Sequence, residues 1–329
     1  MNDGVDVAVD VAVVGAGPCG LAAAIALEQA GIHSVVFDRS CLVSSIASYP
    51  TYVTFFSTPE RLEIGGVPFT IATEKPTRRD GLAYYRRVVE HHRIALRLYE
   101  DVERVERDGD AFTVHSFPRG AAAARTRAKA VVIATGYFGS PNLLGVPGEQ
   151  LPHVAHRFVE GHEAFGRDAL VVGGGNSAVE CALDLQRCGA RVTLAHFGPT
   201  FDHVIKPWIL PDFERLVAGG AIALRWHTRV TAIDADRVQL ATQDGAATVV
   251  AQHVYLMTGY TPVPGLLGAL GVPFDATTGV PAHDPATMET PVRGVFVAGV
   301  IASGNDANSV FIENGRDHGN LIAAAMAGP

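Results

Sequence analysis

The sequence predicts an α/β protein of two Rossmann-like dinucleotide-binding domains, the second inserted into the first. Three observations lead to this prediction. A pattern of strand, glycine-rich turn, helix and strand occurs twice along the 329 residues. Hydrophobic residues make up 48% of the chain and charged residues 18%, which is enough apolar material for two cores. A strand and a helix follow the second unit, so the first domain needs both ends of the chain.

The first unit begins with a Val-rich strand that we expect over residues 9–14. The glycine turn GAGPCG follows at 15–20, and the apolar, helix-forming stretch 21–30 comes after the turn. A second short strand over 34–37 ends in Asp38, at about the distance from the turn that dinucleotide-binding units show. The order and spacing of these elements therefore match the dinucleotide fingerprint at every position.

Each glycine of the first turn has a separate task in this fingerprint. Gly15 permits the tight turn, Gly17 lets the backbone approach a pyrophosphate, and Gly20 lets helix and strand pack closely. The N-terminus of the following helix offers N–H groups and a positive partial charge to the phosphates. Asp38 would accept hydrogen bonds from a ribose diol. We therefore expect an adenine dinucleotide at this turn.

The second unit repeats the pattern with one change. A strand over 169–172 leads into GGGNSA at 173–178, a helix over 179–188 follows, and a strand over 191–195 completes the unit. Alanine replaces the third glycine, which the fingerprint permits. After the last strand, His196 is the nearest candidate for a phosphate partner, and neither an acid for NAD nor an arginine for NADP stands there. The choice between NADH and NADPH therefore stays open.

The remaining elements give the order of the domains. Each unit closes on a short apolar strand, over 130–135 and over 254–258, that runs into a glycine turn. A strand over 294–300 and an apolar helix over 310–326 then end the chain. We treat the stretch 120–129, which has no clear period, as an edge hairpin or loop.

Two Pro- and Gly-rich stretches, 145–152 and 260–265, are typical of linkers between domains. We expect residues 1–146 and 261–329 to form a discontinuous first domain and residues 147–260 to form the second. A flavin and a nicotinamide are the natural pair for two such sites, because hydride passes between stacked rings. We expect FAD in the first domain and NADPH in the second, with NADH as a possible replacement for NADPH.

Charge and composition exclude several classes of function. The formal net charge is −8 and no long run of Lys or Arg occurs, which argues against a nucleic-acid partner. No apolar run reaches the roughly 18–20 residues that a membrane span needs. Residues 1–10 carry three Asp and neither Lys nor Arg, unlike a signal peptide, so we expect a cytoplasmic protein. His91 and His92 have no third ligand nearby in the sequence, so we expect no metal.

Several longer strings are more specific than the glycine turns. They are GAGPCG at 15–20, SYPTYVTFFST at 48–58, EIGGVPF at 63–69, KPTRR at 75–79, YYRRVV at 84–89, ATGYFG at 134–139, GGGNSA at 173–178, IKPWILP at 205–211 and GVIASGNDANSVFIENG at 299–315. On these strings the chain resembles the bacillithiol disulfide reductase (YpdA-type) family, within the thioredoxin reductase-like flavoproteins. The resemblance implies NADPH-dependent, FAD-mediated reduction of the disulfide of a low-molecular-weight thiol, and a homo-oligomer.

The chain departs from thioredoxin reductases in its cysteines, because it contains no CxxC pair. Cys181 and Cys188 lie on one expected helix with Cα atoms about 10 Å apart, whereas a disulfide needs about 4.4–6.8 Å. We expect them to be core residues. Thioredoxin reductases also place an Asp after the late Ala-Gly, where this chain has Val300 after Gly299.

Cys19 is the candidate catalytic residue, because it lies inside the first turn at a helix N-terminus. The helix field stabilises a thiolate, so we expect its pKa to fall from about 8.5 towards 7 or below. In the resembling family this position is the proposed redox cysteine, which would form a mixed disulfide with the substrate. The alternative is that a small residue is needed there and Cys fills the place of Ala.

The candidate cofactor-binding residues come from both turns and from the segments that close each cleft. For the flavin they are Gly15, Ala16, Gly17, Pro18, Cys19, Gly20, Asp38, Arg39, Ser45, Ile46, Tyr49, Val102, Ala134, Thr135, Gly136, Gly299, Asn308 and Ser309. For the nicotinamide nucleotide they are Gly173, Gly175, Asn176, Ser177, Ala178, His196, Gly259 and Tyr260.

Other functions remain open at this point. Flavin monooxygenases and ferredoxin or flavodoxin reductases share the expected architecture, and a regulator that binds NAD(P)H without turnover is a non-enzymatic alternative. No DNA-binding motif or basic face supports the regulator. An aromatic and basic string could form a substrate entrance for an acidic thiol, or could be core and solvated surface. Its members are Tyr49, Tyr52, Phe55, Phe56, Lys75, Arg78 and Arg79.

Overall fold

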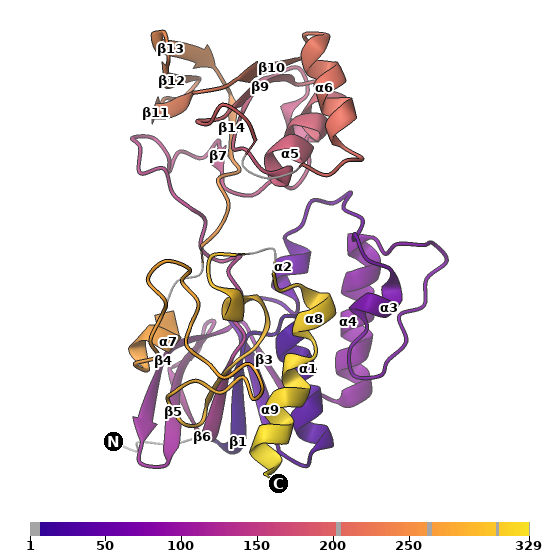
Figure 1. Cartoon of the computed structure of the whole chain (residues 1–329), viewed down its shortest axis with the longest axis vertical. Coiled ribbons are helices and arrows are strands. Elements are labelled where there is room, and N and C mark those ends of the chain that lie inside the picture. Colours follow the sequence, from indigo (N-terminus) through magenta and orange to yellow (C-terminus); the bar gives the residue numbers. More distant parts are fainter. Residues whose placement is uncertain (1–6, 202–204, 262–264, 307–308, 329) are drawn as a thin grey trace. The chain divides into compact units, whose positions relative to one another are not determined.

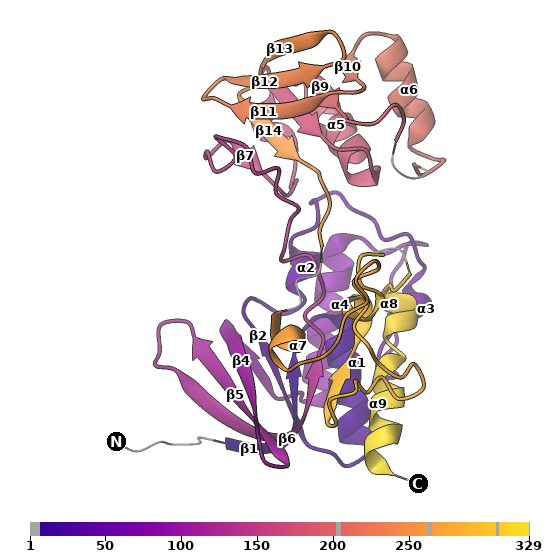
Figure 2. The same ribbon diagram turned by 60° about the vertical axis from the view of Figure 1, so that its left-hand side comes forward.

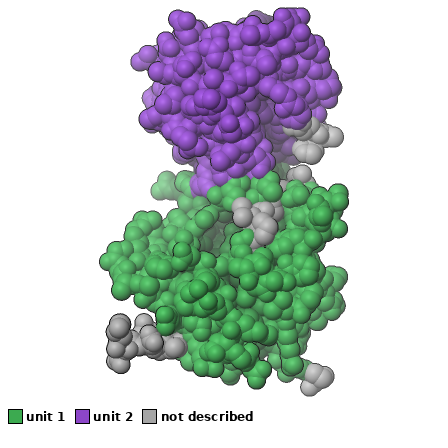
Figure 3. Space-filling model, turned by 90° about the vertical axis from the view of Figure 1, so that its left-hand side faces the viewer, with its two compact units in different colours: residues 1–47, 53–140, 261–329 green, residues 48–52, 141–260 purple. Residues whose placement is uncertain are grey.

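A computed structural model describes residues 7–201, 205–261, 265–306 and 309–328 of the chain. Its contacts divide the chain into two compact units, coloured separately in Figure 3. Unit 1 consists of residues 1–47, 53–140 and 261–329, and unit 2 of residues 48–52 and 141–260. The segment 48–52, which we expected in the first domain, groups with unit 2 instead.

Unit 1 is built on a mixed sheet with helices against it (Figures 1 and 2). Its strands are β1 (Val7–Val14), β2 (Ser34–Asp38), β3 (Leu96–Leu98), β4 (Glu100–Asp108), β5 (Ala111–Pro118), β6 (Ala124–Ile133) and β15 (Val295–Val297). In the described residues their order is β3-β2-β1-β6-β5-β4, and β15 pairs with β6. The central pairs are parallel, with Val14 beside both Phe37 and Ile133. These buried Val-rich strands are typical of a sheet covered on both faces.

Helices from both ends of the chain meet in unit 1. The helices are α1 (Pro18–Gln29), α2 (Ser44–Ala47), α3 (Pro59–Leu62), α4 (Arg78–His92), α7 (Gly265–Ala269), α8 (Ile312–Gly315) and α9 (His318–Ala327). Every α1 residue from Gly20 to Leu27 is buried, and α9 lies alongside α1 (Figures 1 and 2). At Gly319 an added Cβ would lie 2.6 Å from the Cα of Ala23, so the two helices pack in backbone contact.

Unit 2 contains a parallel sheet and a separate antiparallel sheet. Its elements are β7 (Val154–Ala155), β8 (Asp168–Val172), α5 (Asn176–Arg187), β9 (Arg191–Ala195), α6 (Leu210–Ala218), β10 (Ile222–Arg225), β11 (Arg229–Ile233), β12 (Arg237–Thr242), β13 (Gly245–Val250) and β14 (His253–Leu256). The parallel sheet has the order β10-β9-β8-β14-β7, and β11, β12 and β13 form the antiparallel sheet. Each unit therefore contains one strand–turn–helix–strand pattern, as the sequence predicts.

The structure differs from the sequence prediction at the ends of several elements. The expected helix over 310–326 is two helices, α8 and α9, with Arg316 and Asp317 between them. The expected strand over 294–300 ends at Val297, and a 3₁₀ helix, Gly299–Ser303, follows it. The stretch 120–129, which we took as an edge hairpin or loop, contains the turn of the antiparallel β5–β6 hairpin, but its second half belongs to β6, which is a central strand and not an edge strand. Among the described helices, none is long and apolar enough to span a bilayer.

Candidate functional site

The first glycine turn connects β1 to α1 and packs against the end of β6. Gly15 has φ +117°, a conformation that favours glycine, and an added Cβ would overlap the carbonyl oxygen of Ala134. An added Cβ at Gly20 would overlap the carbonyl oxygen of Gly15 and lie 3.2 Å from the Cβ of Ala134. The first and third glycines are therefore required by close packing within unit 1.

Gly17, the middle glycine, is open. No heavy atom lies within 4 Å of an added Cβ there, and Gly17 is the N-cap of α1 without a side-chain cap. Pro18 follows at the first helical position, which suits a proline because it has no N–H to satisfy. An uncapped helix N-terminus beside an open glycine is a cradle for an anion, and it fits the pyrophosphate of a dinucleotide.

Asp38 ends β2 and lies beside the turn. Its Oδ2 accepts a hydrogen bond from the Ala16 backbone N–H at 2.9 Å, and its Oδ1 accepts one from Ser40 N–H at 2.8 Å. Each carboxylate oxygen has a second acceptor position, so the side chain can hold the turn and a ribose diol together. The arrangement fits the adenosine half of a dinucleotide.

Cys19 lies in a narrow niche made by the C-terminal part of the chain. An added Cβ would lie 3.1 Å from its Sγ at Gly299 and 2.8 Å from it at Gly315. The Gly299 N–H donates to His318 Nδ1 at 3.2 Å, which fixes this wall of the niche. Two glycines far along the sequence thus leave space for one sulfur atom.

The environment of Cys19 overturns the expected lowering of its pKa. Burial, the larger cause, together with the negative charge of Glu313 raises the pKa of Cys19 to about 12. The hydroxyl of Ser57 donates a short hydrogen bond to the same Glu313 carboxylate. The N-terminal position of Cys19 on α1 suggested a thiolate, but these surroundings, contributed by distant segments, favour the thiol.

The second glycine turn connects β8 to α5 in unit 2. Gly173 has φ +152°, and an added Cβ would overlap the carbonyl oxygen of Met257. Gly175 has no heavy atom within 4 Å of an added Cβ, and it is the uncapped N-cap of α5. Ala178 occupies the third position with its side chain buried. The open middle glycine and uncapped helix again fit a pyrophosphate.

Asn176 and Lys206 join this turn to the segment before α6. The Oδ1 of Asn176 accepts a hydrogen bond from Lys206 N–H at 2.9 Å. The Nζ of Lys206 lies 3.0 Å from Glu180 Oε1 on α5, and burial lowers the pKa of Lys206. These bonds hold residues 205–209 beside the N-terminal end of α5.

Comparison with known proteins identifies the family. The profile of a family described as pyridine nucleotide-disulphide oxidoreductase matches residues 12–299. The chain belongs to the pyridine nucleotide-disulphide oxidoreductase family. Members of this family are flavin-dependent oxidoreductases that also use a pyridine nucleotide, and this chain is therefore an enzyme of that kind.

Several members of the family are similar over nearly the full length. Bacilliredoxin reductase Bdr of Bacillus subtilis is 45% identical over 317 residues, 96% of each chain. The solved bacillithiol disulfide reductase Bdr (YpdA) of Bacillus cereus is 45% identical, with 97% of this chain and 99% of that chain covered and a TM-score of 0.95. The Staphylococcus aureus structure of the same name is 39% identical, covers 97% and 98%, and has a TM-score of 0.91. The resemblance inferred from the motifs is confirmed.

A more distant likeness extends to the fold alone. Thioredoxin reductase of Lactococcus lactis is 21% identical, with 97% of each chain covered and a TM-score of 0.75. It supports the predicted thioredoxin reductase-like fold class of this oxidoreductase.

The other residues expected at the flavin lie on several elements of unit 1. Gly136 follows β6 with φ +64°, Ile46 is buried in α2, and Val102 is buried in β4. The guanidinium of Arg39 lies against Gly139, where an added Cβ would overlap it. Ser309 is exposed, and its hydroxyl donates to the carbonyl oxygen of Asp306.

Thr135, Ser45, Tyr49 and Asn308 are also among the residues expected at the flavin. Thr135 is exposed and Ser45 is half-buried, both in unit 1, whereas Tyr49 belongs to the segment that groups with unit 2. Asn308 lies outside the described residues. The role of each as a flavin contact stays a prediction.

The residues expected to close the nicotinamide site differ in their hydrogen bonds and in their exposure. Gly259 follows β14 with φ +82°, and its carbonyl oxygen accepts a hydrogen bond from Asn142 N–H at 3.0 Å. The hydroxyl of Tyr260 donates to the carbonyl oxygen of His156 at 2.8 Å. Ser177 is exposed in the first turn of α5. Their contact with a nucleotide stays a prediction.

His196 is buried, with 1% of its surface exposed, and its ring lies 4.5 Å from that of Phe197 and 5.9 Å from that of Trp226. A phosphate partner must reach the surface, so this burial weighs against the role that we expected. The neighbouring cations that do reach the surface are Arg225 and Arg229. Sequence reasoning missed them because they come about 30 residues later, and the string RWHTR at 225–229 was the signal for them.

The aromatic and basic string divides between core and surface. Phe55 is buried against Gly81, whereas Phe56 is 55% exposed. The Nη2 of Arg78 donates to the carbonyl oxygen of Ala47 at 2.5 Å, so this cation has a structural partner. Tyr52, with 44% exposed, packs beside Phe158 at 6.4 Å between ring centroids. The string does not behave as a single surface.

Two further findings in the described part of the chain concern the cysteines of α5 and the arrangement of side chains that could bind a metal. Cys181 is fully buried in α5, as expected of a core residue, whereas Cys188, a free thiol at the C-cap of α5, is only half-buried, so the expectation that it is a core residue is wrong. No group of three His, Cys, Asp or Glu residues there is arranged to hold a metal ion.

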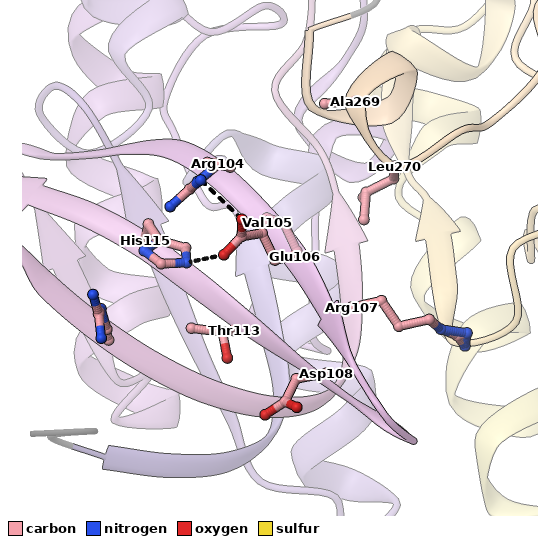
Figure 4. A pocket seen from close by; sticks show the side chains of 10 residues that line it. Arg104, Val105, Glu106, Arg107, Asp108, Thr113, His115, Ala269 and Leu270 are labelled. Carbon is pink, nitrogen blue, oxygen red and sulfur yellow. Dashed lines mark hydrogen bonds and ion pairs between the residues drawn. The ribbon is translucent and has the colours of Figure 1, made fainter. Parts of the chain in front are cut away.

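One groove of unit 1 is lined by residues of neither glycine turn. It has a volume of about 690 Å³ and follows the β4–β5 hairpin, where Glu106 accepts from His115 and Arg104 (Figure 4). Its walls are charged and open, and neither of the glycine turns contributes to it. We therefore locate the site by the turns and not by this groove.

Proposed function

We propose that the protein is an FAD-dependent reductase that uses NADPH to reduce bacillithiol disulfide or a similar low-molecular-weight disulfide. The observation that carries the proposal is the pair of open glycine cradles, at Gly17 in unit 1 and at Gly175 in unit 2, in a chain that is 45% identical to the Bdr relatives. The printed names of the Bdr relatives supply the substrate class. We also propose a cytoplasmic enzyme, because a reductase of small disulfides suits a compartment that is kept reducing.

Unit 1 is the proposed flavin domain. Gly17 and the N-terminus of α1 would hold the pyrophosphate, Asp38 would bind the ribose, and the backbone around Gly136 and Gly299 would line the remaining length. When bound, the flavin takes a hydride from the nicotinamide and supplies an electron pair for the disulfide. Support comes from the close packing that leaves the middle of this turn open.

Unit 2 is the proposed NADPH domain. Gly175 and the N-terminus of α5 would hold the pyrophosphate, with Asn176 kept in place by its bond to Lys206. The nucleotide exchanges after each turnover, so its site needs an open surface. Support comes from the exposure of Ser177 and of Phe197, which follows β9.

Cys19 is the proposed residue that meets the disulfide. Its Sγ would attack one sulfur, which breaks the disulfide and releases one thiol, and a mixed disulfide would remain on Cys19. That bond would then accept an electron pair and two protons, which releases the second thiol and restores the Cys19 thiol. Because the pKa of Cys19 is raised, its proton must leave as the new S–S bond forms.

An anaerobic half-reaction tests this function. The holoenzyme is bleached with one equivalent of NADPH, and bacillithiol disulfide is then added. We expect the oxidised flavin spectrum to return and two thiols to appear per disulfide. Reoxidation by ferredoxin but not by disulfide would support a ferredoxin reductase, and a stable oxygen adduct in air would support a monooxygenase. Either result would contradict the proposal.

The variant Cys19→Ala separates the function from the role of this cysteine. We expect flavin reduction by NADPH to persist while thiol release falls at least about tenfold, and the control Cys188→Ala to keep wild-type rates. Unchanged thiol release in Cys19→Ala would remove Cys19 from the chemistry and leave the reductase in place. We also propose a homo-oligomer, as the family resemblance implies, and sedimentation measures its size.

A further inference from the structure

The carboxyl ends of β9 and β10 form one edge of the parallel sheet in unit 2. Ala195, the last residue of β9, pairs with Arg225, the last residue of β10. The chain beyond them continues side by side, because Thr228 N–H donates to the carbonyl oxygen of His196 at 2.9 Å, and His227 N–H donates to that of Gly198 at 3.1 Å. The second glycine turn leaves β8 at this same edge, since all three strands are parallel.

This pairing brings Phe197 and Arg229 together. The guanidinium carbon of Arg229 lies 4.6 Å from the centroid of the Phe197 ring. Phe197 is 52% exposed and Arg229 is also exposed. A guanidinium that lies over an aromatic ring keeps its N–H groups in a fixed plane, and these groups match the oxygens of a phosphate in pairs. The pair therefore presents an oriented cation at the edge where β9 ends.

In a dinucleotide-binding unit, the residue that ends the second strand is next to the ribose of the adenosine. An acid there accepts the 2′-hydroxyl of NAD, whereas a nearby arginine accommodates the 2′-phosphate of NADP. Residues 195–200, AHFGPT, contain no acid, and the ring of His196 faces the interior. Beside the exposed Pro199 and Thr200, this corner thus presents an aromatic ring and arginines to solvent.

We propose that Phe197 and Arg229 form the subsite that selects NADPH over NADH, with Arg229 binding the 2′-phosphate and Phe197 holding the guanidinium in place. This inference rests on the proposed function, in which unit 2 binds the nicotinamide nucleotide. Arg225, the last residue of β10, adds positive charge at the same edge of the sheet. The Phe197 ring, however, lies against Arg229.

Equilibrium binding of NADP⁺ and NAD⁺ to the holoenzyme, measured by calorimetry, tests the subsite without turnover. Wild type should prefer NADP⁺. We expect Arg229→Gln to weaken NADP⁺ binding at least about tenfold and to change NAD⁺ binding less than about twofold. Phe197→Leu should weaken NADP⁺ by a smaller factor, and Arg229→Lys should restore part of it. Arg237→Gln, at an exposed arginine of β12, is the matched control and should change neither.

Three results would overturn the inference. They are equal losses for both nucleotides in Arg229→Gln, unchanged NADP⁺ binding in that variant, and a wild type that prefers NAD⁺. In the first two cases the proposed function still stands whole, whereas a wild type that prefers NAD⁺ would keep the disulfide reductase but replace NADPH with NADH as its reductant. If wild type binds neither nucleotide, the proposed function itself fails, and this is visible before any variant is made. Thermal unfolding of each variant shows whether a loss of binding reflects a loss of folding.

Discussion

The two glycine turns follow the same fingerprint, yet they are enclosed to different degrees. In unit 1 the helix after the turn is buried along Gly20–Leu27, and α9 from the far end of the chain packs against it. In unit 2, Glu180, Asp184 and Arg187 keep part of α5 accessible to solvent. The fifth position shows the same contrast, because Cys19 fills a niche and Ser177 is exposed.

This contrast indicates how one fold serves two kinds of nucleotide. A turn that is covered by distant segments of its own unit suits a cofactor that stays, since release would require those segments to separate. A turn on an open helix suits a nucleotide that must leave after each reaction. The covered turn also changes the chemistry of its side chains, because burial raises the pKa of Cys19.

The largest expected difference between the turns is in thiol reactivity. A thiol with a pKa of about 12 is almost wholly protonated at pH 8, so Cys19 should react with iodoacetamide on the order of a thousandfold more slowly than a free cysteine of pKa about 8.5. The variant Ser177→Cys, at the matching position of the open turn, should react at least as fast as a free cysteine. Peptide mass spectrometry over time measures both rates.

The rate of Cys19 alkylation should also depend on pH. Cys19 alkylation should rise with pH up to about 12, and Glu313→Gln should accelerate it because one negative charge is removed. A rate for Cys19 that levels off near pH 8 would show that burial does not control this thiol.

Substitutions at the third fingerprint position of each turn, Gly20 in unit 1 and Ala178 in unit 2, should change stability by different amounts. Gly20→Ala should destabilise unit 1 by about 1–3 kcal/mol and reduce flavin retention, because the new Cβ overlaps the Gly15 carbonyl. Ala178→Gly should cost only about 1 kcal/mol, the usual penalty for glycine within a helix. Thermal unfolding with and without added FAD measures both. Equal costs in the two turns would contradict the difference in packing.

The acid at the end of β2 has no counterpart in unit 2 and gives a smaller effect. Asp38→Asn removes the charge that accepts from Ala16 and Ser40, so FAD affinity should fall about tenfold. Asp108→Asn, at an exposed aspartate of β4, should leave FAD affinity unchanged. Fluorescence titration of the deflavinated protein with FAD gives both dissociation constants, and an unaltered value for Asp38→Asn would remove Asp38 from the ribose site.

Local sequence signals predict the two turns well, because their requirements are local. Gly15 and Gly173 need positive φ within a few residues of a strand end, and helix and strand propensities on either side agree. The same reasoning missed the break between α8 and α9, because it continued the expected helix through the polar stretch 313–320, which includes Arg316 and Asp317 between the two helices.

Features that depend on distant segments are beyond such reasoning. The pKa of Cys19 follows from burial and from Glu313, about 300 residues away in the sequence, and the helix position alone suggested the opposite direction. Arg229 reaches the end of β9 through strand pairing, so no motif near His196 predicts it. The grouping of residues 48–52 with unit 2 depends on tertiary contacts such as Thr51 N–H to the Val159 carbonyl.

The central claim is that unit 1 retains a flavin while unit 2 exchanges its nucleotide. The most direct test loads the protein with excess FAD and NADP⁺, passes it through a desalting column, and analyses the nucleotides released by denaturation. The account predicts an equimolar amount of FAD and almost no NADP⁺. Protein that stays colourless even after incubation with FAD, or that keeps NADP⁺ while FAD washes away, would contradict it.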